Sequence, residues 1–268
     1  AEGSYYIGGT AACGSAWEAG GRMRRRRNGL RVLMWGCVLI HSDYVVPPEV
    51  LESDLAYLSG HGYQAVLVSD LVEYVYNGKP LPEKPVMITF DDGYYNNYLN
   101  AYPLLQKYQM KAVISIIVGE TDKYSELDEN KENYSHITWN MINEMMESGL
   151  IEIQNHTYDL HSHTHRQGCG ILPEESETAY RELLRSDLEQ LQSLLASQVQ
   201  MRPVVFTYPY GYVCRESIPV LRSMGFLATL TCYEEWGHDL TSFQCFLHIG
   251  IGGNAVGTVV SADAKQTV

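Results

Sequence analysis

Short apolar runs alternate with amphipathic segments along most of the chain. Runs with the length and composition of buried strands lie at residues 31–40, 63–68, 85–90, 112–118, 150–154, 203–207, 226–231 and 246–251. Segments with the spacing of amphipathic helices lie at 47–60, 70–76, 139–148, 174–198 and 216–224, and one more ends near 108. This alternation has no internal repeat and no obvious linker. It predicts one parallel-stranded α/β domain, open or closed into a barrel.

The two ends of the chain and one internal segment lack the alternation. Residues 1–29 are rich in Gly, Ala and Arg, and we interpret them as a poorly ordered arm. Residues 252–268 have the composition of a flexible tail, so the predicted domain spans residues 30–251. Within it, the acidic stretch 119–135 lacks the glycine and the spacing of a calcium-binding loop. We expect that stretch to be a solvated loop.

Polar side chains collect where three of the predicted strands end. Asp91 and Asp92 follow one strand, His156 follows a second, and the Tyr-Pro-Tyr-Gly segment at 208–211 follows a third. Because parallel α/β folds bind ligands at the carboxyl ends of their strands, we expect these segments to share one site. Neighbouring residues at a strand end point in different directions, so one carboxylate could ligate a metal while the other faces a substrate. Gly93 would allow a sharp turn beside them.

Four histidines lie within the ten residues that begin at His156. Two imidazoles with one carboxylate are a natural ligand set for zinc or a neighbouring divalent metal, and they leave positions open for water. The spacing alone does not decide which two histidines bind the metal. His156 and His161 are five residues apart, whereas His161 and His165 are four apart. We favour His156 and His161, since His156 holds the strand-end position. His163 and His165 are then outside the ligand set.

Three motifs, in this order, resemble those of polysaccharide deacetylases of the NodB-homology type (carbohydrate esterase family 4). The first motif of that family, Thr-Phe-Asp-Asp-Gly, is complete at Thr89–Gly93. The second, His-Ser/Thr followed by another His, matches His156 and His161 with one residue more than the usual spacing, as in poly-N-acetylglucosamine deacetylases. The third, Arg-x-Pro-Tyr/Phe-Gly, matches at 209–211, with Thr207 in the place of the arginine.

The resemblance spans roughly residues 30–250 and implies both a fold and a cofactor. The implied fold is a single-domain, distorted (β/α) barrel of about seven parallel strands. Asp92, His156 and His161 would bind one divalent metal. Zinc is the first candidate for that metal, with cobalt, nickel or manganese as alternatives.

The resemblance also implies a reaction and the residues that perform it. The reaction is the metal-dependent hydrolysis of acetamido groups on an N-acetylglucosamine polymer, such as peptidoglycan, poly-N-acetylglucosamine or a chitin-like glycan, with release of acetate. Asp91 would be the general base. Tyr210, beside Pro209, would offer its backbone N–H to the oxyanion. His248, which follows Leu247, matches the position of the family's general acid.

Composition and net charge limit the classes of partner that the protein can have. The net charge of −13 argues against a nucleic-acid partner, and no stretch of about 18 apolar residues predicts a transmembrane helix. The six cysteines contain no Cys-x-x-Cys pair and leave the compartment open. The resemblance to the family suggests that the protein is located in the cell envelope or outside the cell. The oligomeric state stays open.

Two other functions are compatible with the sequence. Thr207 in the place of the motif arginine is compatible with a catalytically degenerate homologue that only binds carbohydrate. A related amidohydrolase that acts on a small amide would use the same metal ligands.

Overall fold

The computed structural model describes residues 30–35, 46–127, 129–231, 244–247, 251–252, 254–255 and 258–260. Within these residues one sheet has the strand order β11-β1-β3-β4-β5-β6-β7-β8, with β2 paired to β3. Its strands are β1 Leu30–Trp35, β2 Gln64–Ala65, β3 Pro85–Phe90, β4 Ala112–Ile116, β5 Ile151–Asn155, β6 Val205–Thr207, β7 Ala228–Thr231, β8 Gln244–Leu247 and β11 Thr258–Val260. Two further short strands, β9 Ile251–Gly252 and β10 Asn254–Ala255, pair with each other.

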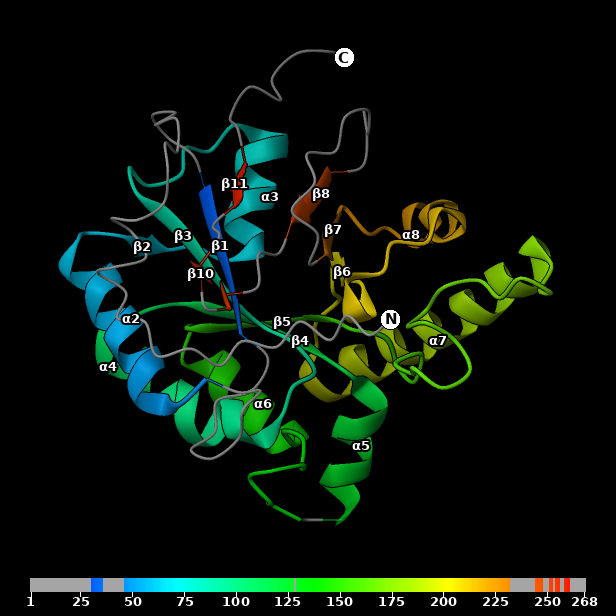
Figure 1. Ribbon diagram of the computed structural model, residues 1–268, viewed down its shortest axis with the longest axis horizontal. Helices are drawn as coiled ribbons and strands as arrows, with labels where there is room; N and C mark the ends of the chain where they lie inside the picture. Colours follow the sequence, from blue (N-terminus) through cyan, green and yellow to red (C-terminus); the bar gives the residue numbers. More distant parts are fainter. Residues whose placement is uncertain are drawn as a thin grey trace.

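From β1 to β8 the neighbouring strands of this order pair in parallel, whereas β11 runs antiparallel to β1. The strands turn progressively through space, so that the sheet curls (Figure 1). This is the predicted distorted (β/α) barrel. The carboxyl ends of its strands gather at one edge, where the polar segments of the sequence lie.

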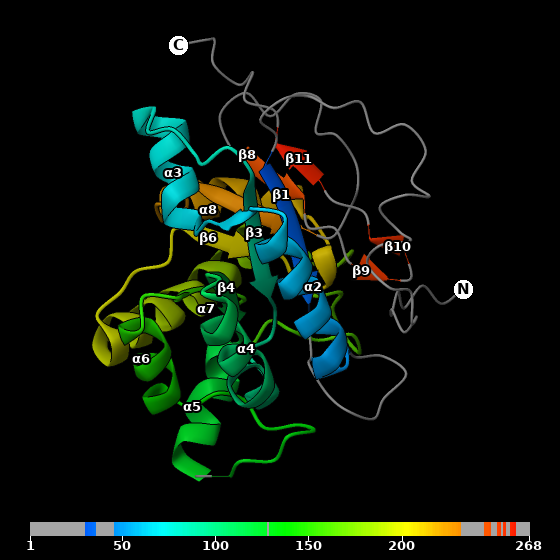
Figure 2. The same ribbon diagram turned by 90° about the vertical axis from the view of Figure 1, so that its left-hand side faces the viewer.

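Helices follow most of the strands. They are α2 Pro48–Gly60, α3 Val68–Asn77, α4 Tyr102–Tyr108, α5 Val118–Leu127, α6 Trp139–Glu147, α7 Glu177–Val199 and α8 Ile218–Ser223, with a π-helical turn at Asn97–Ala101 and 3₁₀ turns at Pro209–Gly211 and Arg215–Ser217. Helices α4, α5, α6 and α7 gather on one side of the sheet, and α3 stands apart from them (Figure 2). Among the described residues, no helix is long and apolar enough to cross a membrane.

The alternation of side chains along β3 divides the interior into two layers. Val86, Ile88 and Phe90 belong to the large apolar cluster that the outer helices cover. Met87 points the other way and packs with residues of β4, β6, β7 and α3: Val113, Val205, Ala228, Leu230, Val68 and Leu71. Each large apolar side chain that is fully buried in this way stabilises the fold by roughly 1.5–3 kcal/mol.

The same face becomes polar towards the carboxyl ends of the strands. Thr89 follows Met87 on the inner face of β3, and it is fully buried. Ser115 on β4 and Thr207 on β6 form a buried hydrogen bond of 2.7 Å between their hydroxyl oxygens. The inner face therefore changes from apolar to hydrogen-bonding just below the edge that carries the candidate site.

The expectation of a solvated loop at 119–135 is wrong for its first half. Helix α5 covers Val118–Leu127, and it buries Val118, Thr121 and Tyr124 at helical spacing. A stripe of one valine, one threonine and one tyrosine is a weak apolar signal in the sequence. Tertiary contacts complete the helix, among them the bond from the Trp139 indole N–H to the Asp122 carboxylate (3.0 Å).

The strand predicted at 63–68 is also shorter than expected. Only Gln64–Ala65 pairs with β3, and α3 begins at Val68. The Asp70 carboxylate accepts the backbone N–H of Leu67 at 3.1 Å and so stabilises the first turn of that helix. The expected arm at 1–29 lies outside the described residues. The domain boundary at residue 251 stays a prediction, and β11, which pairs with β1, lies beyond it.

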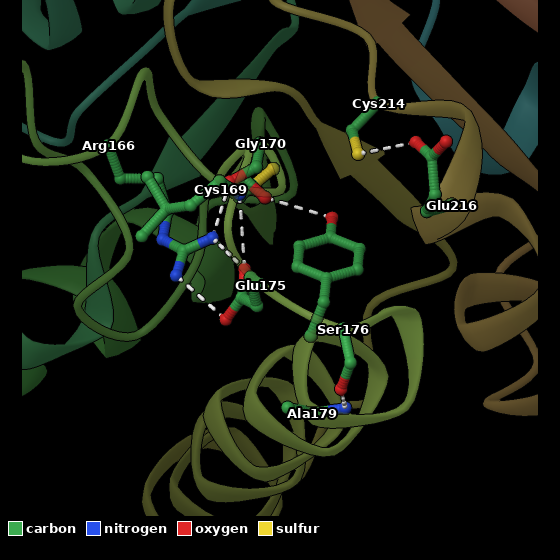
Figure 3. Close-up of polar contacts among 10 residues, drawn as sticks. Arg166, Cys169, Gly170, Glu175, Ser176, Ala179, Cys214 and Glu216 are labelled. Atoms are coloured by element: carbon green, nitrogen blue, oxygen red, sulfur yellow. Dashed lines mark hydrogen bonds and ion pairs between the residues drawn. The ribbon is translucent and has the colours of Figure 1, made fainter.

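A serine side chain caps the N-terminus of α7. The Ser176 hydroxyl accepts the Ala179 N–H at 3.2 Å (Figure 3). Ser176→Ala should therefore lower the free energy of unfolding by about 1 kcal/mol, because a helix N-terminal N–H loses its partner. Ser186→Ala, at an exposed position of the same helix, should change it by less than about 0.5 kcal/mol. Urea unfolding followed by circular dichroism measures both, and equal values would contradict a capping role.

Candidate active site

A tight turn after β3 holds the two adjacent carboxylates. Asp92 and Gly93 both adopt left-handed backbone conformations, with φ of 67° and 75°. A Cβ on Gly93 would lie 2.8 Å from the Ile116 Cγ2, so only glycine fits there. The Gly93 carbonyl accepts the Ile137 N–H at 2.9 Å, and the Asp92 carbonyl accepts the Ile117 N–H at 3.3 Å. The turn is thus bonded to segments on two sides.

His156 stands directly at the end of β5 and is buried. Its backbone N–H donates to the Ile116 carbonyl at 3.0 Å. Its ring Nδ1 lies 2.9 Å from the Thr207 carbonyl oxygen, which can only accept, so Nδ1 carries the proton. The other ring nitrogen, Nε2, faces Asp92 and lies 3.3 Å from its Oδ1.

His161 reaches the same carboxylate oxygen from the loop that follows β5. Its Nε2 lies 3.1 Å from Asp92 Oδ1. Its Nδ1 lies 3.1 Å from the Tyr210 hydroxyl, and the two ring centroids are 4.4 Å apart. Tyr210 therefore fixes the orientation of His161 much as the Thr207 carbonyl fixes that of His156.

The three side chains have the features of a ligand set for one divalent metal. One donor atom each from Asp92, His156 and His161 lies within 4.8 Å of the other two. Both imidazoles have their Nδ1 hydrogen-bonded on the far side, which is the usual arrangement for metal-ligating histidines. Two nitrogen donors and one oxygen donor suit zinc and similar ions. The residues present thus fit the metal that the sequence predicted.

The pKa values of Asp92 and His156 are also consistent with a site for a cation. Burial raises the pKa of the Asp92 carboxyl, but hydrogen bonds and charge from His156 and His161 outweigh this and hold that pKa well below its usual range. Burial lowers the pKa of His156, but its hydrogen bond to Asp92 and the charges of Asp91 and Asp92 outweigh this, and the net pKa is raised. The carboxylates therefore favour a positive charge at this position.

Asp91 and the segment at 209–211 complete the neighbourhood. Asp91 is half-buried and lies close enough for its charge to raise the pKa of His156. Pro209 begins the 3₁₀ turn after β6, and Tyr210 has a left-handed φ of 57°. The structure thus brings Asp91, Asp92, the two favoured histidines and the third motif to one edge of the sheet.

The position of the missing arginine is occupied by a buried threonine with two contacts. The Thr207 hydroxyl bonds to Ser115, and its carbonyl oxygen accepts from His156. The threonine therefore supports the group formed by Asp92, His156 and His161 through its backbone.

Of the other predicted residues, His163 lies against the Tyr210 ring, with centroids 3.4 Å apart and the rings tilted by 35°, and His165 is exposed. Neither is among the three residues whose donor atoms converge, which are Asp92, His156 and His161. His248 lies outside the described residues. Sequence reasoning missed the Tyr210 hydroxyl and the Thr207 carbonyl, because neither feature carries a signal of its own in a single sequence.

A loop with its own ion pair packs beside the third motif. Arg166 donates to both carboxylate oxygens of Glu175, at 2.8 and 3.0 Å, and also to the Gly170 carbonyl (Figure 3). A Cβ on Gly168 would lie 2.8 Å from the Pro209 carbonyl oxygen, so this loop touches the turn closely. The ion pair thereby helps to support the turn that carries Tyr210.

Known proteins resemble the chain in both sequence and structure. Poly-beta-1,6-N-acetyl-D-glucosamine N-deacetylase of Escherichia coli (strain K12) is 31% identical over 200 residues, which cover 68% of this chain and 30% of that protein. The protein of the same name from Staphylococcus aureus (strain MSSA476) is 29% identical over 183 residues, which cover 68% of this chain and 59% of that protein. The chain thus spans less than two thirds of the length of these relatives.

Among solved structures, that of IcaB from Ammonifex degensii aligns with a TM-score of 0.70 and 27% identity, and the alignment covers 83% of this chain and 91% of that one. The family model for polysaccharide deacetylases matches residues 78–229. The matched segment is more than half of the chain and includes the Asp92, His156 and His161 cluster. The chain therefore belongs to the polysaccharide deacetylase family.

Proposed function

We propose that the protein is a metal-dependent N-deacetylase that hydrolyses acetamido groups of an N-acetylglucosamine-containing polysaccharide and releases acetate. The observation that carries this proposal is the convergence of Asp92, His156 and His161, with both Nδ1 atoms bonded away from the centre. The names of the two bacterial relatives support poly-N-acetylglucosamine as the first substrate to test, with peptidoglycan and chitin-like glycans as alternatives. A cell-envelope or extracellular location fits such a substrate.

In this proposal Asp92, His156 and His161 hold the metal, with zinc as the first candidate. When bound, a divalent metal polarises the acetamide carbonyl and lowers the pKa of water. Asp91, the carboxylate that is not in the ligand set, accepts the proton of the attacking water. The backbone N–H of Tyr210 donates to the developing oxyanion, a contribution of roughly 3–4 kcal/mol for one such donor. His248 stays the predicted general acid.

The substrate class can be tested directly. Zinc-loaded protein should release acetate from oligomers of β-1,6-linked N-acetylglucosamine, with kcat/KM rising with oligomer length as more sugars contact the protein. An enzyme-coupled acetate assay measures this. A kcat/KM that is higher for N-acetylglucosamine monomer or a simple acetamide would favour the small-amide hydrolase. Oligomer binding that survives metal removal, without acetate release, would favour the carbohydrate-binding homologue.

The role of Asp91 predicts a separation of binding from catalysis. Asp91→Asn should lower kcat by about 10²–10⁴-fold, because the amide cannot accept the proton, while zinc affinity stays close to that of the wild type. Glu83→Gln, an exposed change just before β3 and at its opposite end, should leave both quantities unchanged. Acetate release and zinc titration calorimetry measure the two quantities. If Asp91→Asn lost zinc binding to the same degree as activity, Asp91 would be a ligand instead.

Metal binding should be linked to proton release. The pKa of His156 is raised in the metal-free protein, whereas its Nε2 must be unprotonated to bind zinc. Zinc affinity should therefore rise with pH through the range in which His156 loses its extra proton, and level off once His156 is neutral. Titration calorimetry in buffers of different ionisation enthalpy measures the released proton. The variant His165→Ala, which lacks an exposed imidazole, should release the same number of protons on zinc binding as the wild type. Binding heats that do not depend on the buffer would contradict the linkage.

A further inference from the structure

A carboxylate lies buried in the apolar stripe of α7. Asp187 is 9% exposed, and its helical neighbours Leu184, Leu188 and Leu191 are fully buried. Burial raises the pKa of this carboxyl to about 6. An apolar side chain would pack here without the cost of removing a charge from water. The packing of the helix therefore gives no reason for an acid at this position.

The two oxygens of Asp187 bind the loop that carries the histidines. Oδ1 accepts the backbone N–H of Tyr158 and Oδ2 accepts that of Asp159, both at 2.8 Å. These two residues lie between His156 and His161. Each carboxylate oxygen thus has a backbone donor from the middle of the loop.

The two ends of that loop are held differently. His156 is fixed by β5, by its N–H bond to Ile116 and by the Thr207 carbonyl. The chain then turns at Thr157, which has a φ of 73°, and the Asn155 side chain accepts the Thr157 N–H at 2.7 Å. These contacts belong to the strand and its first turn.

His161 lies further along the loop. After Thr157, the Tyr158 carbonyl accepts the Gly119 N–H at 2.9 Å, and Asp187 then holds two successive N–H groups. The side chain of His161 contacts Asp92, Tyr210 and the His156 ring. Asp187 therefore holds the backbone two and three residues before His161.

We propose that Asp187 is a positioning residue for the metal site, which sets the loop so that His161 meets Asp92 and His156. This inference rests on the metal site proposed above. In this proposal Asp187 positions only one of the two histidines. It acts through His161, and the position of His156 does not depend on it.

Asp187→Asn should weaken zinc binding by about 10–100-fold, the usual effect of removing an outer partner of a metal ligand. The amide keeps one acceptor oxygen, but its NH₂ group faces a backbone N–H that then lacks an acceptor. Glu189→Gln, an exposed change two residues along the same helix, should bind zinc like the wild type. Titration calorimetry measures affinity, and the visible spectrum of the cobalt-loaded protein reports the ligand geometry, which should change only in Asp187→Asn.

Double variants separate positioning from general destabilisation. Adding Asp187→Asn to His161→Ala should cause no further loss of zinc affinity, because the ligand through which it acts is gone. Adding it to His156→Ala should still weaken binding about 10-fold or more. Equal losses in both backgrounds, or wild-type affinity and cobalt spectrum for Asp187→Asn alone, would overturn the proposal.

A measurement on the wild type covers the case in which Asp187→Asn does not fold. In the metal-free protein the Tyr158 and Asp159 amides should exchange their hydrogens slowly, since both are bonded to a buried carboxylate. Exchange at the rate of an unstructured peptide would overturn the proposal. None of these experiments uses a substrate. Wild-type protein that binds zinc but releases no acetate would therefore contradict the proposed function and leave the role of Asp187 intact.

Discussion

The contact between one carboxylate oxygen and two imidazoles is the interaction on which the edge of the sheet depends. Asp92 Oδ1 lies within 3.3 Å of both Nε2 atoms, at a place where burial opposes an ionised carboxyl. Such a charge is tolerated only when it is paired and hydrogen-bonded. The Thr207 carbonyl and the Tyr210 hydroxyl therefore matter as much as the ligands, because they turn both Nε2 atoms towards Asp92.

The sheet makes this contact possible by bringing three distant segments together. Parallel pairing of β3 to β4, β4 to β5 and β5 to β6 aligns the ends of these strands, although Asp92 and Thr207 are more than 100 residues apart in sequence. Below the edge, the buried Ser115–Thr207 hydroxyl pair links β4 to β6 across β5. A hydroxyl pair at the position of the motif arginine introduces no additional charge. Burial lowers the pKa of His156, but its hydrogen bonds to Asp92 and Thr207 and the charges of the two aspartates outweigh this and raise it.

Residues that combine a strand end with a reactive side chain could be predicted from the sequence. Asp92 and His156 each follow an apolar strand, and the parallel pattern placed both at one edge. The helical character of 118–127 could not be predicted in the same way, because the buried face of α5 includes a threonine and depends on contacts with α6. The Tyr210 hydroxyl was also beyond reach, since its bond to His161 requires a left-handed turn that depends on tertiary structure.

Asp187 shows most clearly what a single sequence conceals, because an acid within a leucine-rich helix is usually read as part of its solvated face. Its pKa of about 6 exceeds the ordinary value of 3.8, so the folded state holds more protons than the unfolded state between these values. Stability contributed by this group therefore falls as pH rises through that window, by about 3 kcal/mol in all. Above its pKa the ionised carboxylate opposes folding, and the backbone N–H groups of the loop between His156 and His161 compensate for only part of the cost of burial. The four residues between His156 and His161 give the loop room to turn at Thr157 and to present both N–H groups to α7. The histidine spacing and the buried acid are thus two parts of one arrangement, in which a buried carboxylate holds the backbone of the loop that leads to His161.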